Sequence, residues 1–282
     1  MKGYTSIADL ANDLRKNAWK VPADVSLIVG VPRSGLMAAI MLGEILHKRV
    51  MGLQEYINGL NPMAGARIIH AHNEHNKDGR VLVLDDTVYS GGSMQKVRSA
   101  IGWRKDVLFA CVYAEGKDAK DKVDLWMVDN YNPNEELWHL YEWNILHHGR
   151  KLSEHSMWDI DGLMCKEPPD ERDTKAYEAY IANAVPMVIP TTTLGAVVTY
   201  RLPKYRDITA EWLNKQGINY GQLIMPQFCM ERSWRDSAEY KGVMYRDADW
   251  ARLFVESDFK QAFDIARISR KQVYCYTDGK MY

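Results

Sequence analysis

Short apolar runs alternate with helical patterns along the first half of this chain. The apolar runs are 25–31, 81–84, 107–113 and 124–128, and helical patterns lie at 8–19, 36–46 and 93–101. Strands that alternate with helices are typical of βαβ units, in which a mostly parallel sheet is buried between helices. The alternation therefore predicts an α/β fold with helices on both faces of the sheet.

The same alternation starts again near residue 155. Strand candidates are 155–160, 195–199, 252–256 and 272–276, and helical patterns lie at 171–184, 205–216, 237–245 and 258–268. A chain of 282 residues is long enough for two domains. We expect one α/β domain over 1–150 and a second over 151–282, with the junction within 144–154.

Charge and composition exclude several classes of protein. The chain has 36 Lys and Arg against 37 Asp and Glu, and this balance, without a basic patch, argues against nucleic-acid binding. No apolar run approaches the ~20 residues of a membrane span, and the first residues lack a signal-peptide pattern. Four widely spaced cysteines, Cys111, Cys165, Cys229 and Cys275, favour buried thiols in a reducing compartment. We expect a cytoplasmic protein, with an oligomer as one option.

Residues 81–94, VLVLDDTVYSGGSM, place two adjacent carboxylates, Asp85 and Asp86, at the end of an apolar strand. A turn of small and hydroxyl residues follows, and then a helix. Glycines let backbone N–H groups approach an anion, and the helix N-terminus adds a favourable dipole. Acids beside such an anion site suit the hydroxyls of a sugar, or a Mg²⁺ on the same ligand. A phosphorylated sugar satisfies both halves of the pattern.

This run resembles the 5-phosphoribosyl 1-diphosphate (PRPP) signature of the type I phosphoribosyltransferases. Residues 29–36, VGVPRSGL, resemble the loop with which that family holds the leaving diphosphate. The resemblance covers roughly 20–130, and the polar segment 55–80 stands where the family carries its mobile catalytic loop. Side chains of that segment that could close over the diphosphate are Arg67, His70, His72, His75 and Lys77.

The resemblance implies a role for each part of the motif. Asp85 and Asp86 would hold the ribose hydroxyls, while Arg33, next to Ser34, would hold the diphosphate together with Mg²⁺. The loop for the 5′-phosphate would consist of Thr87, Ser90, Gly91, Gly92 and Ser93. Displacement of diphosphate from an oxocarbenium-like carbon is then a matter of positioning and electrostatics.

The acceptor is a nucleobase-like molecule that the sequence does not name. The 6-oxopurine members of the family have an acidic residue where this chain has Tyr89, so the resemblance argues against hypoxanthine and guanine. Aromatic residues gather within 126–148: Trp126, Tyr131, Trp138, Tyr141 and Trp143. They either form a hood over a base or pack between the domains.

A second acidic motif, SMWDIDGL at 156–163, places Asp159 and Asp161 at the end of an apolar stretch. Two such carboxylates can divide the work of a nucleophile and of an acid and base. Their like charge requires a cation nearby. Further polar residues follow at strand ends or on a polar helix: Thr199 with Arg201 close behind, Lys241, and then Glu256 and Asp258.

Over about 152–282 this set resembles the haloacid dehalogenase (HAD) superfamily of phosphohydrolases. The resemblance implies that Asp159 is the nucleophile and Asp161 the acid and base, while Thr199 and Lys241 hold the phosphoryl oxygens. Alternatives to Lys241 are Lys204, Lys215, Lys260 and Lys271. The implied Mg²⁺ ligands are Asp159, Asp161 and either Glu256 or Asp258. The short spacing between the first two motifs leaves little room for a cap domain.

Together the two resemblances imply a bifunctional enzyme. The first domain would join a base to PRPP, and the second would remove the 5′-phosphate of the nucleotide that forms. In the alternative, the second domain hydrolyses a separate phosphorylated small molecule or nucleotide, and the first binds PRPP or a nucleotide as a regulatory module. Release of diphosphate when a base is supplied would distinguish the two.

Overall fold

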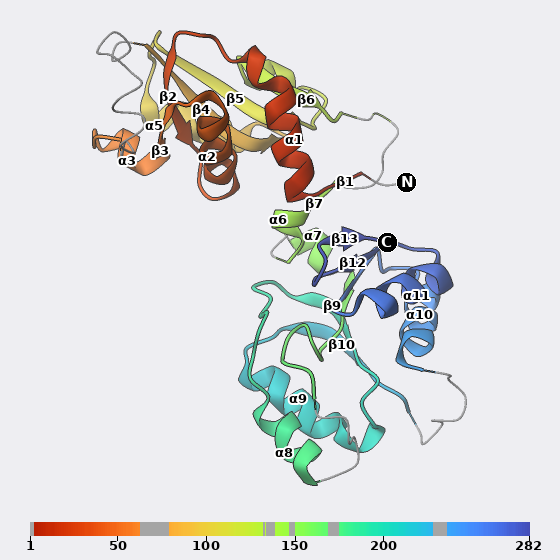
Figure 1. Ribbon diagram of the computed structural model, residues 1–282. Coiled ribbons are helices and arrows are strands. Elements are labelled where there is room, and N and C mark those ends of the chain that lie inside the picture. The colour runs from red at the N-terminus through yellow and green to blue at the C-terminus, as the bar shows by residue number, and fades with distance from the viewer. Residues whose placement is uncertain are drawn as a thin grey trace. The chain divides into compact units, whose positions relative to one another are not determined.

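The computed structural model describes residues 3–62, 79–131, 133, 139–146, 150–168, 175–227 and 236–282 (Figure 1). The chain divides into two compact units, Met1–His139 and Leu140–Tyr282. Residues 140–150, which we expected in the first domain, are therefore part of the second unit. Each unit contains a largely parallel sheet with helices, as the alternation predicts. In the described part of the chain, no helix combines the length and apolar character needed to span a membrane.

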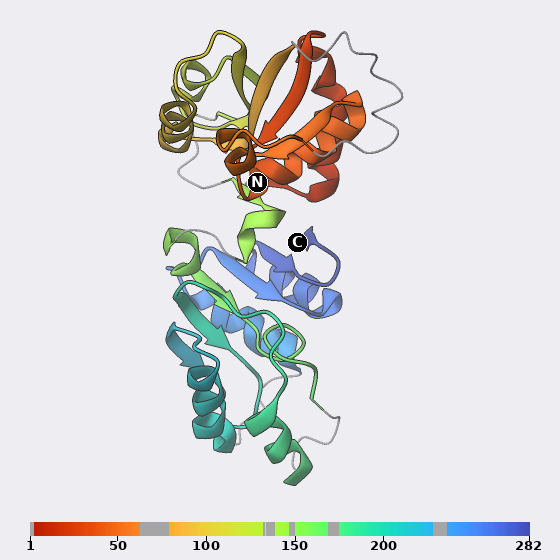
Figure 2. The same ribbon diagram turned by 90° about the vertical axis from the view of Figure 1, so that its left-hand side faces the viewer.

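The first unit has a five-stranded parallel sheet in the order β3-β2-β4-β5-β6. The strands are β2 (Val25–Gly30), β3 (Arg49–Gly52), β4 (Arg80–Val88), β5 (Val107–Ala114) and β6 (Leu125–Asp129). The helices are α1 (Ile7–Asn17), α2 (Ser34–Leu46), α3 (Leu53–Ile57) and α5 (Gly92–Ile101). Figure 2 shows α5 on one side of the strands and α1, which packs against α2, on the other.

Local sequence explains these elements. Every residue of β2 is buried, as expected for a strand covered on both faces. A capping box between Ser6 and Asp9 starts α1, because each side chain accepts a hydrogen bond from the other residue's backbone N–H. The predicted strands and helices of this half are confirmed within a few residues. The short edge strand β3 was not predicted, and β4 extends past both acids to Val88.

The second unit has a six-stranded sheet in the order β10-β9-β8-β11-β12-β13, in which β13 alone is antiparallel. The strands are β8 (Ser156–Trp158), β9 (Leu194–Val198), β10 (Tyr220–Ile224), β11 (Leu253–Glu256), β12 (Val273–Cys275) and β13 (Lys280–Met281). The longer helices are α8 (Lys175–Asn183), α9 (Arg206–Lys215), α10 (Ser237–Asp247) and α11 (Phe259–Ser269). Figure 1 shows α10 and α11 together on one side of the sheet, with α8 and α9 on the other.

The strand order explains where a ligand can bind in the second unit. The chain runs from β8 outward to β9 and β10, and then returns to place β11 on the other side of β8. The connections that leave β8 and β11 therefore depart in opposite directions. In open parallel sheets this topological switch point leaves a crevice at the carboxyl ends of the two strands.

Candidate functional site

The carboxyl ends of β8, β9 and β11 bring the second acidic motif together. Asp159 follows β8, and its N–H donates to the carbonyl of Val255 in β11 at 3.0 Å. Glu256 ends β11, and Thr199 follows β9. Asp159, Thr199 and Glu256 are all 3 % exposed or less. The switch point therefore holds two buried carboxylates and a buried hydroxyl.

Lys241 of α10 supplies the cation that the two carboxylates require. Its Nζ lies 2.7 Å from Asp159 Oδ2 and 2.8 Å from Glu256 Oε2. A third contact, at 3.2 Å, reaches Oε1 of Gln261. Of the lysines that the sequence offered, the structure brings Lys241 to the acids. All three donors of its ammonium have acceptors within the protein.

The charges of this cluster depend on one another. Burial, followed by the charge of Glu256, raises the pKa of Asp159 well above its ordinary value, and Lys241 opposes that shift. Burial alone would lower the pKa of Lys241, but Asp159 and Glu256 together raise it. The ammonium therefore stays charged, and the two carboxylates compete for it.

Asp161 has its own cation in Arg201. The guanidinium donates to both carboxylate oxygens, from Nη2 at 2.5 Å and from Nε at 3.1 Å. Arg201 is 2 % exposed, and its Nη1 donates to Thr209 Oγ1 of α9 at 3.3 Å. Its own N–H donates to Thr199 Oγ1 at 3.3 Å. The sequence interpretation gave Arg201 no role, although its place just after Thr199 was visible.

The turn after Asp161 needs a glycine. Gly162 has a φ of +76°, and a Cβ there would lie 2.5 Å from Ser257 Oγ. That Ser257 hydroxyl donates to the main-chain carbonyl of Asp161 at 3.2 Å. Ser257 therefore ties the end of β11 to the Asp159-Asp161 turn.

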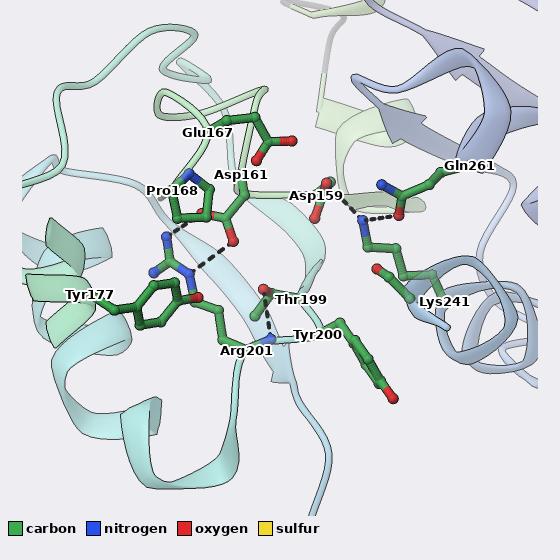
Figure 3. Close-up of a pocket in the computed structure, with 11 residues that line it drawn as sticks. Asp159, Asp161, Glu167, Pro168, Tyr177, Thr199, Tyr200, Arg201, Lys241 and Gln261 are labelled. Atoms are coloured by element: carbon green, nitrogen blue, oxygen red, sulfur yellow. Dashed lines mark hydrogen bonds and ion pairs between the residues drawn. The ribbon is translucent and has the colours of Figure 1, made fainter. Parts of the chain in front are cut away.

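A pocket of about 360 Å³ opens onto this cluster (Figure 3). In Figure 3 Asp159 faces Lys241, while Asp161 faces Arg201. Lining residues that the sequence interpretation did not name for this site are Glu167, Pro168, Tyr177, Tyr200, Ser237 and Gln261. That volume includes the part of the pocket that is open to solvent.

The expected Mg²⁺ ligands do not form a metal site in the described residues. No group of three or more His, Cys, Asp or Glu among them is arranged to hold a metal ion. Asp161 is held by Arg201, and Asp159 by Lys241. Glu256 Oε2 contacts Lys241, while its Oε1 accepts from the N–H of Ser257 at 2.9 Å. Asp258 caps α11 by accepting from Gln261 N at 2.8 Å. This donor set does not fit the cation that the resemblance implies.

In the first unit the structure brings the two predicted phosphate motifs together. Ser34, the first residue of α2, donates its hydroxyl to Asp86 Oδ1 at 2.8 Å. Thr87 donates to the other oxygen of Asp86 at 3.2 Å. Gly35 lies so close to Asp85 that a Cβ there would be 2.8 Å from the aspartate Cα. The peptide bond before Arg33 is cis, and Arg33 itself is exposed.

Both acids of the first motif are buried. Asp85 is 7 % exposed and Asp86 is 4 % exposed, because β4 continues through them. Burial, followed by the neighbouring Asp86, raises the pKa of Asp85 to about 8. A contact between either acid and ribose hydroxyls remains a prediction, and for Asp86 it would have to replace hydrogen bonds that already exist.

The loop after the acids is open to solvent. Tyr89, Ser90, Gly92 and Ser93 are exposed, and α5 begins at Gly92. Gly91 has a φ of +77°, and a Cβ there would lie 2.6 Å from Cγ of Lys122. The loop therefore combines free backbone groups with a helix N-terminus and a nearby lysine, an arrangement that suits an anion.

Other predicted residues are placed as follows. Arg67, His70, His72, His75, Lys77, Trp138 and Cys229 lie outside the described residues. Cys111, Cys165 and Cys275 are buried free thiols, as expected. Trp126 and Tyr131 belong to the first unit, and Tyr141 and Trp143, whose rings are 5.0 Å apart, to the second. Neither the hood nor the packing interpretation of these aromatics is decided.

No protein-family model and no curated protein matches the sequence. Among solved structures, a purine phosphoribosyltransferase from Pyrococcus horikoshii Ot3 is similar at 21% identity, over 50% of this chain and 93% of that one, with a TM-score of 0.35. The Helicobacter pylori xanthine-guanine-hypoxanthine phosphoribosyltransferase is 21% identical over 51% of this chain and 95% of that one, with a TM-score of 0.35. Orotate phosphoribosyltransferase from Aeropyrum pernix is 21% identical over 43% of this chain and 69% of that one, with a TM-score of 0.30. At such scores, the function of this chain has to be argued from its own residues.

Proposed function

We propose that this chain joins a phosphohydrolase, in the second unit, to a PRPP-dependent phosphoribosyltransferase, in the first. The observation that carries the phosphohydrolase assignment is the Asp159-Lys241-Glu256 cluster at the switch point of a parallel sheet. A buried carboxylate beside a buried ammonium, at the mouth of a pocket, is a typical environment for a nucleophile. The closeness of Thr199 and of the Asp161-Arg201 pair supports the same role.

The reaction in the second unit would proceed in two displacements. An oxygen of Asp159 attacks the phosphorus of a phosphate monoester, so that an aspartyl phosphate forms and the ester P–O bond breaks. Asp161 would have to exchange one of its two hydrogen bonds from Arg201 for a proton before the reaction. It would give that proton to the leaving alkoxide and then take one from the water that cleaves the aspartyl phosphate. Lys241 and the Thr199 hydroxyl would stabilise the charge on the phosphoryl oxygens. Arg201 would fix the direction of the Asp161 carboxylate.

A second observation favours PRPP in the first unit. The Ser34–Asp86 hydrogen bond places the start of α2 beside the acid motif, so both loops face one region at the carboxyl ends of β2 and β4. Two anion-binding loops beside carboxylates match a ligand with a 5′-phosphate, a diphosphate and ribose hydroxyls. The nitrogen of an acceptor base would attack the anomeric carbon as diphosphate leaves.

Phosphorus NMR on the full chain tests both parts at once. The purified protein is incubated with PRPP, Mg²⁺ and a pool of nucleobases, beside Asp159→Asn and Asp86→Asn variants. We expect diphosphate and inorganic phosphate from the wild type, and a trapped nucleotide from Asp159→Asn. The Asp86→Asn variant should leave PRPP intact.

Two other outcomes would change the proposal. If PRPP stays intact with every base, the transferase is wrong and the first unit becomes a candidate binding module for PRPP. A screen of phosphorylated small molecules and nucleotides, with and without PRPP, would then test the phosphohydrolase alone. If Asp159→Asn releases phosphate as fast as the wild type from every substrate, the phosphohydrolase assignment fails.

A further inference from the structure

The carboxylates at the switch point of the second unit already have permanent partners. Lys241 neutralises part of the charge of Asp159 and Glu256, and Arg201 neutralises Asp161. Both oxygens of Glu256 accept hydrogen bonds from the protein. Among the oxygens of Asp159, Asp161 and Glu256, Oδ1 of Asp159 is the one that the contacts above leave for a cation. Glu167, a further acid that lines the pocket, already interacts with another group.

Ser257 is an uncharged side chain beside the Asp159-Asp161 turn. It follows Glu256 at the end of β11, it is 7 % exposed, and its hydroxyl donates to the Asp161 carbonyl at 3.2 Å. An acid at this position would lie beside the Asp161 carbonyl and add a negative charge next to the turn. A serine brings no charge, and its proton takes up a carbonyl oxygen that a cation would otherwise use.

The geometry of Lys241 also works against a resident divalent ion. Mg²⁺ binds oxygen at about 2.1 Å, keeps several waters, and usually has one or two carboxylates plus the phosphates of a substrate. An ion on Asp159 Oδ1 would lie roughly 4–5 Å from the ammonium on Oδ2, where like charges repel. One carboxylate oxygen cannot outweigh that repulsion without a further anion.

We propose that the second unit keeps no resident divalent cation without substrate. Lys241 is the permanent counter-ion of Asp159 and Glu256, and Ser257, at the end of β11, brings no further carboxylate. The inference concerns metal binding alone and does not depend on any activity.

A titration of the full chain with Mn²⁺ in phosphate-free buffer tests the proposal. The electron paramagnetic resonance signal of the free ion decreases as Mn²⁺ binds, so its loss measures the bound ion. The proteins are the wild type, Asp159→Asn, Ser257→Asp and the double variant. Asn214→Asp, on the exposed end of α9, controls for the added charge. At about 1 mM Mn²⁺ we expect wild type and Asp159→Asn to bind alike. Ser257→Asp should bind one further ion at least about tenfold more tightly, and Asp159→Asn should abolish that gain.

Two results would overturn the proposal. One is an ion bound by the wild type that Asp159→Asn releases, since a resident site would then exist. The other is a folded Ser257→Asp variant, checked by circular dichroism, that gains nothing over Asn214→Asp. If Ser257→Asp does not fold, the comparison of wild type with Asp159→Asn decides alone. A protein that hydrolyses no phosphate ester still gives a clear result here, so the two proposals fail independently.

Discussion

Replacing Lys241 by Met removes the ammonium that Asp159 and Glu256 share. The two carboxylate oxygens that contact it can be no more than about 5.5 Å apart. At an effective dielectric constant of about 20, two charges at that separation repel by about 3 kcal/mol. Breaking a buried ion pair by removing one partner costs about 3–5 kcal/mol. We therefore expect Lys241→Met to lower the free energy of unfolding of the second unit by about 3–5 kcal/mol at pH 8.

The loss should shrink at lower pH. Burial already raises the pKa of Asp159, and without Lys241 that pKa rises further. The folded variant then keeps a proton that the unfolded chain, with an ordinary Asp pKa of 3.8, has released. Such a group stabilises the folded state at low pH, and that stabilisation is lost as the pH rises through the folded-state pKa. One proton corresponds to at most about 1.4 kcal/mol per pH unit, so the deficit should be smaller at pH 6 than at pH 8.

Urea unfolding at pH 6 and pH 8 measures the effect, with hydrogen exchange of peptides from β8 and β11 reporting on the second unit. Lys260→Met is the matched control, because Lys260 is exposed on α11 and lies over the ring of Phe259. Its effect should stay within about 0.5 kcal/mol. A loss below about 1 kcal/mol at pH 8 for Lys241→Met, or one that does not change with pH, would refute the role of the ammonium as counter-ion.

Three further predictions follow from the other contacts. Asp85→Asn should stabilise the first unit at pH 8.5 but hardly at pH 5. The folded wild type, in which the pKa of Asp85 is about 8, becomes less stable as the pH rises through that pKa. Urea unfolding at the two pH values checks this. Gly91→Ala and Gly102→Ala both place alanine at a φ near +78°, where a non-glycine residue costs about 1–3 kcal/mol. Only Gly91→Ala should abolish the thermal shift caused by PRPP, and equal shifts would contradict the phosphate loop. Arg201→Lys cannot hold both oxygens of Asp161, so kcat should fall at least about tenfold with little change in KM; unchanged kcat would show that this pairing is unnecessary.

The sequence alone was sufficient for the central strands of both sheets. Runs such as 25–31 and 107–113 become β2 and β5, because a strand covered on both faces must be apolar at nearly every position. The edge strands β3, β10 and β13 were missed. Their residues are largely half-buried or exposed, so they carry little of the apolar signal on which the prediction depends.

Placement of acids at strand ends was also visible in the sequence, because residues that follow neighbouring parallel strands meet at one edge of a sheet. Asp159, Thr199 and Glu256 illustrate this. The acids of the first unit differ, since β4 continues through Asp85 and Asp86 and buries both. The sequence pattern did not reveal that the strand runs on.

Only the tertiary structure decided which charges are shared. It selected Lys241 from several lysines, gave Asp161 to Arg201, and used Asp258 as a helix cap rather than as a second acid beside Glu256. Hydrophobic periodicity reflects the environment of each segment, so the sequence determined two parallel α/β sheets and the strand ends that carry polar groups. An ion pair joins residues from separate elements within about 3 Å, and that distance is set by the packing of α10 and the turn after β9 against the sheet.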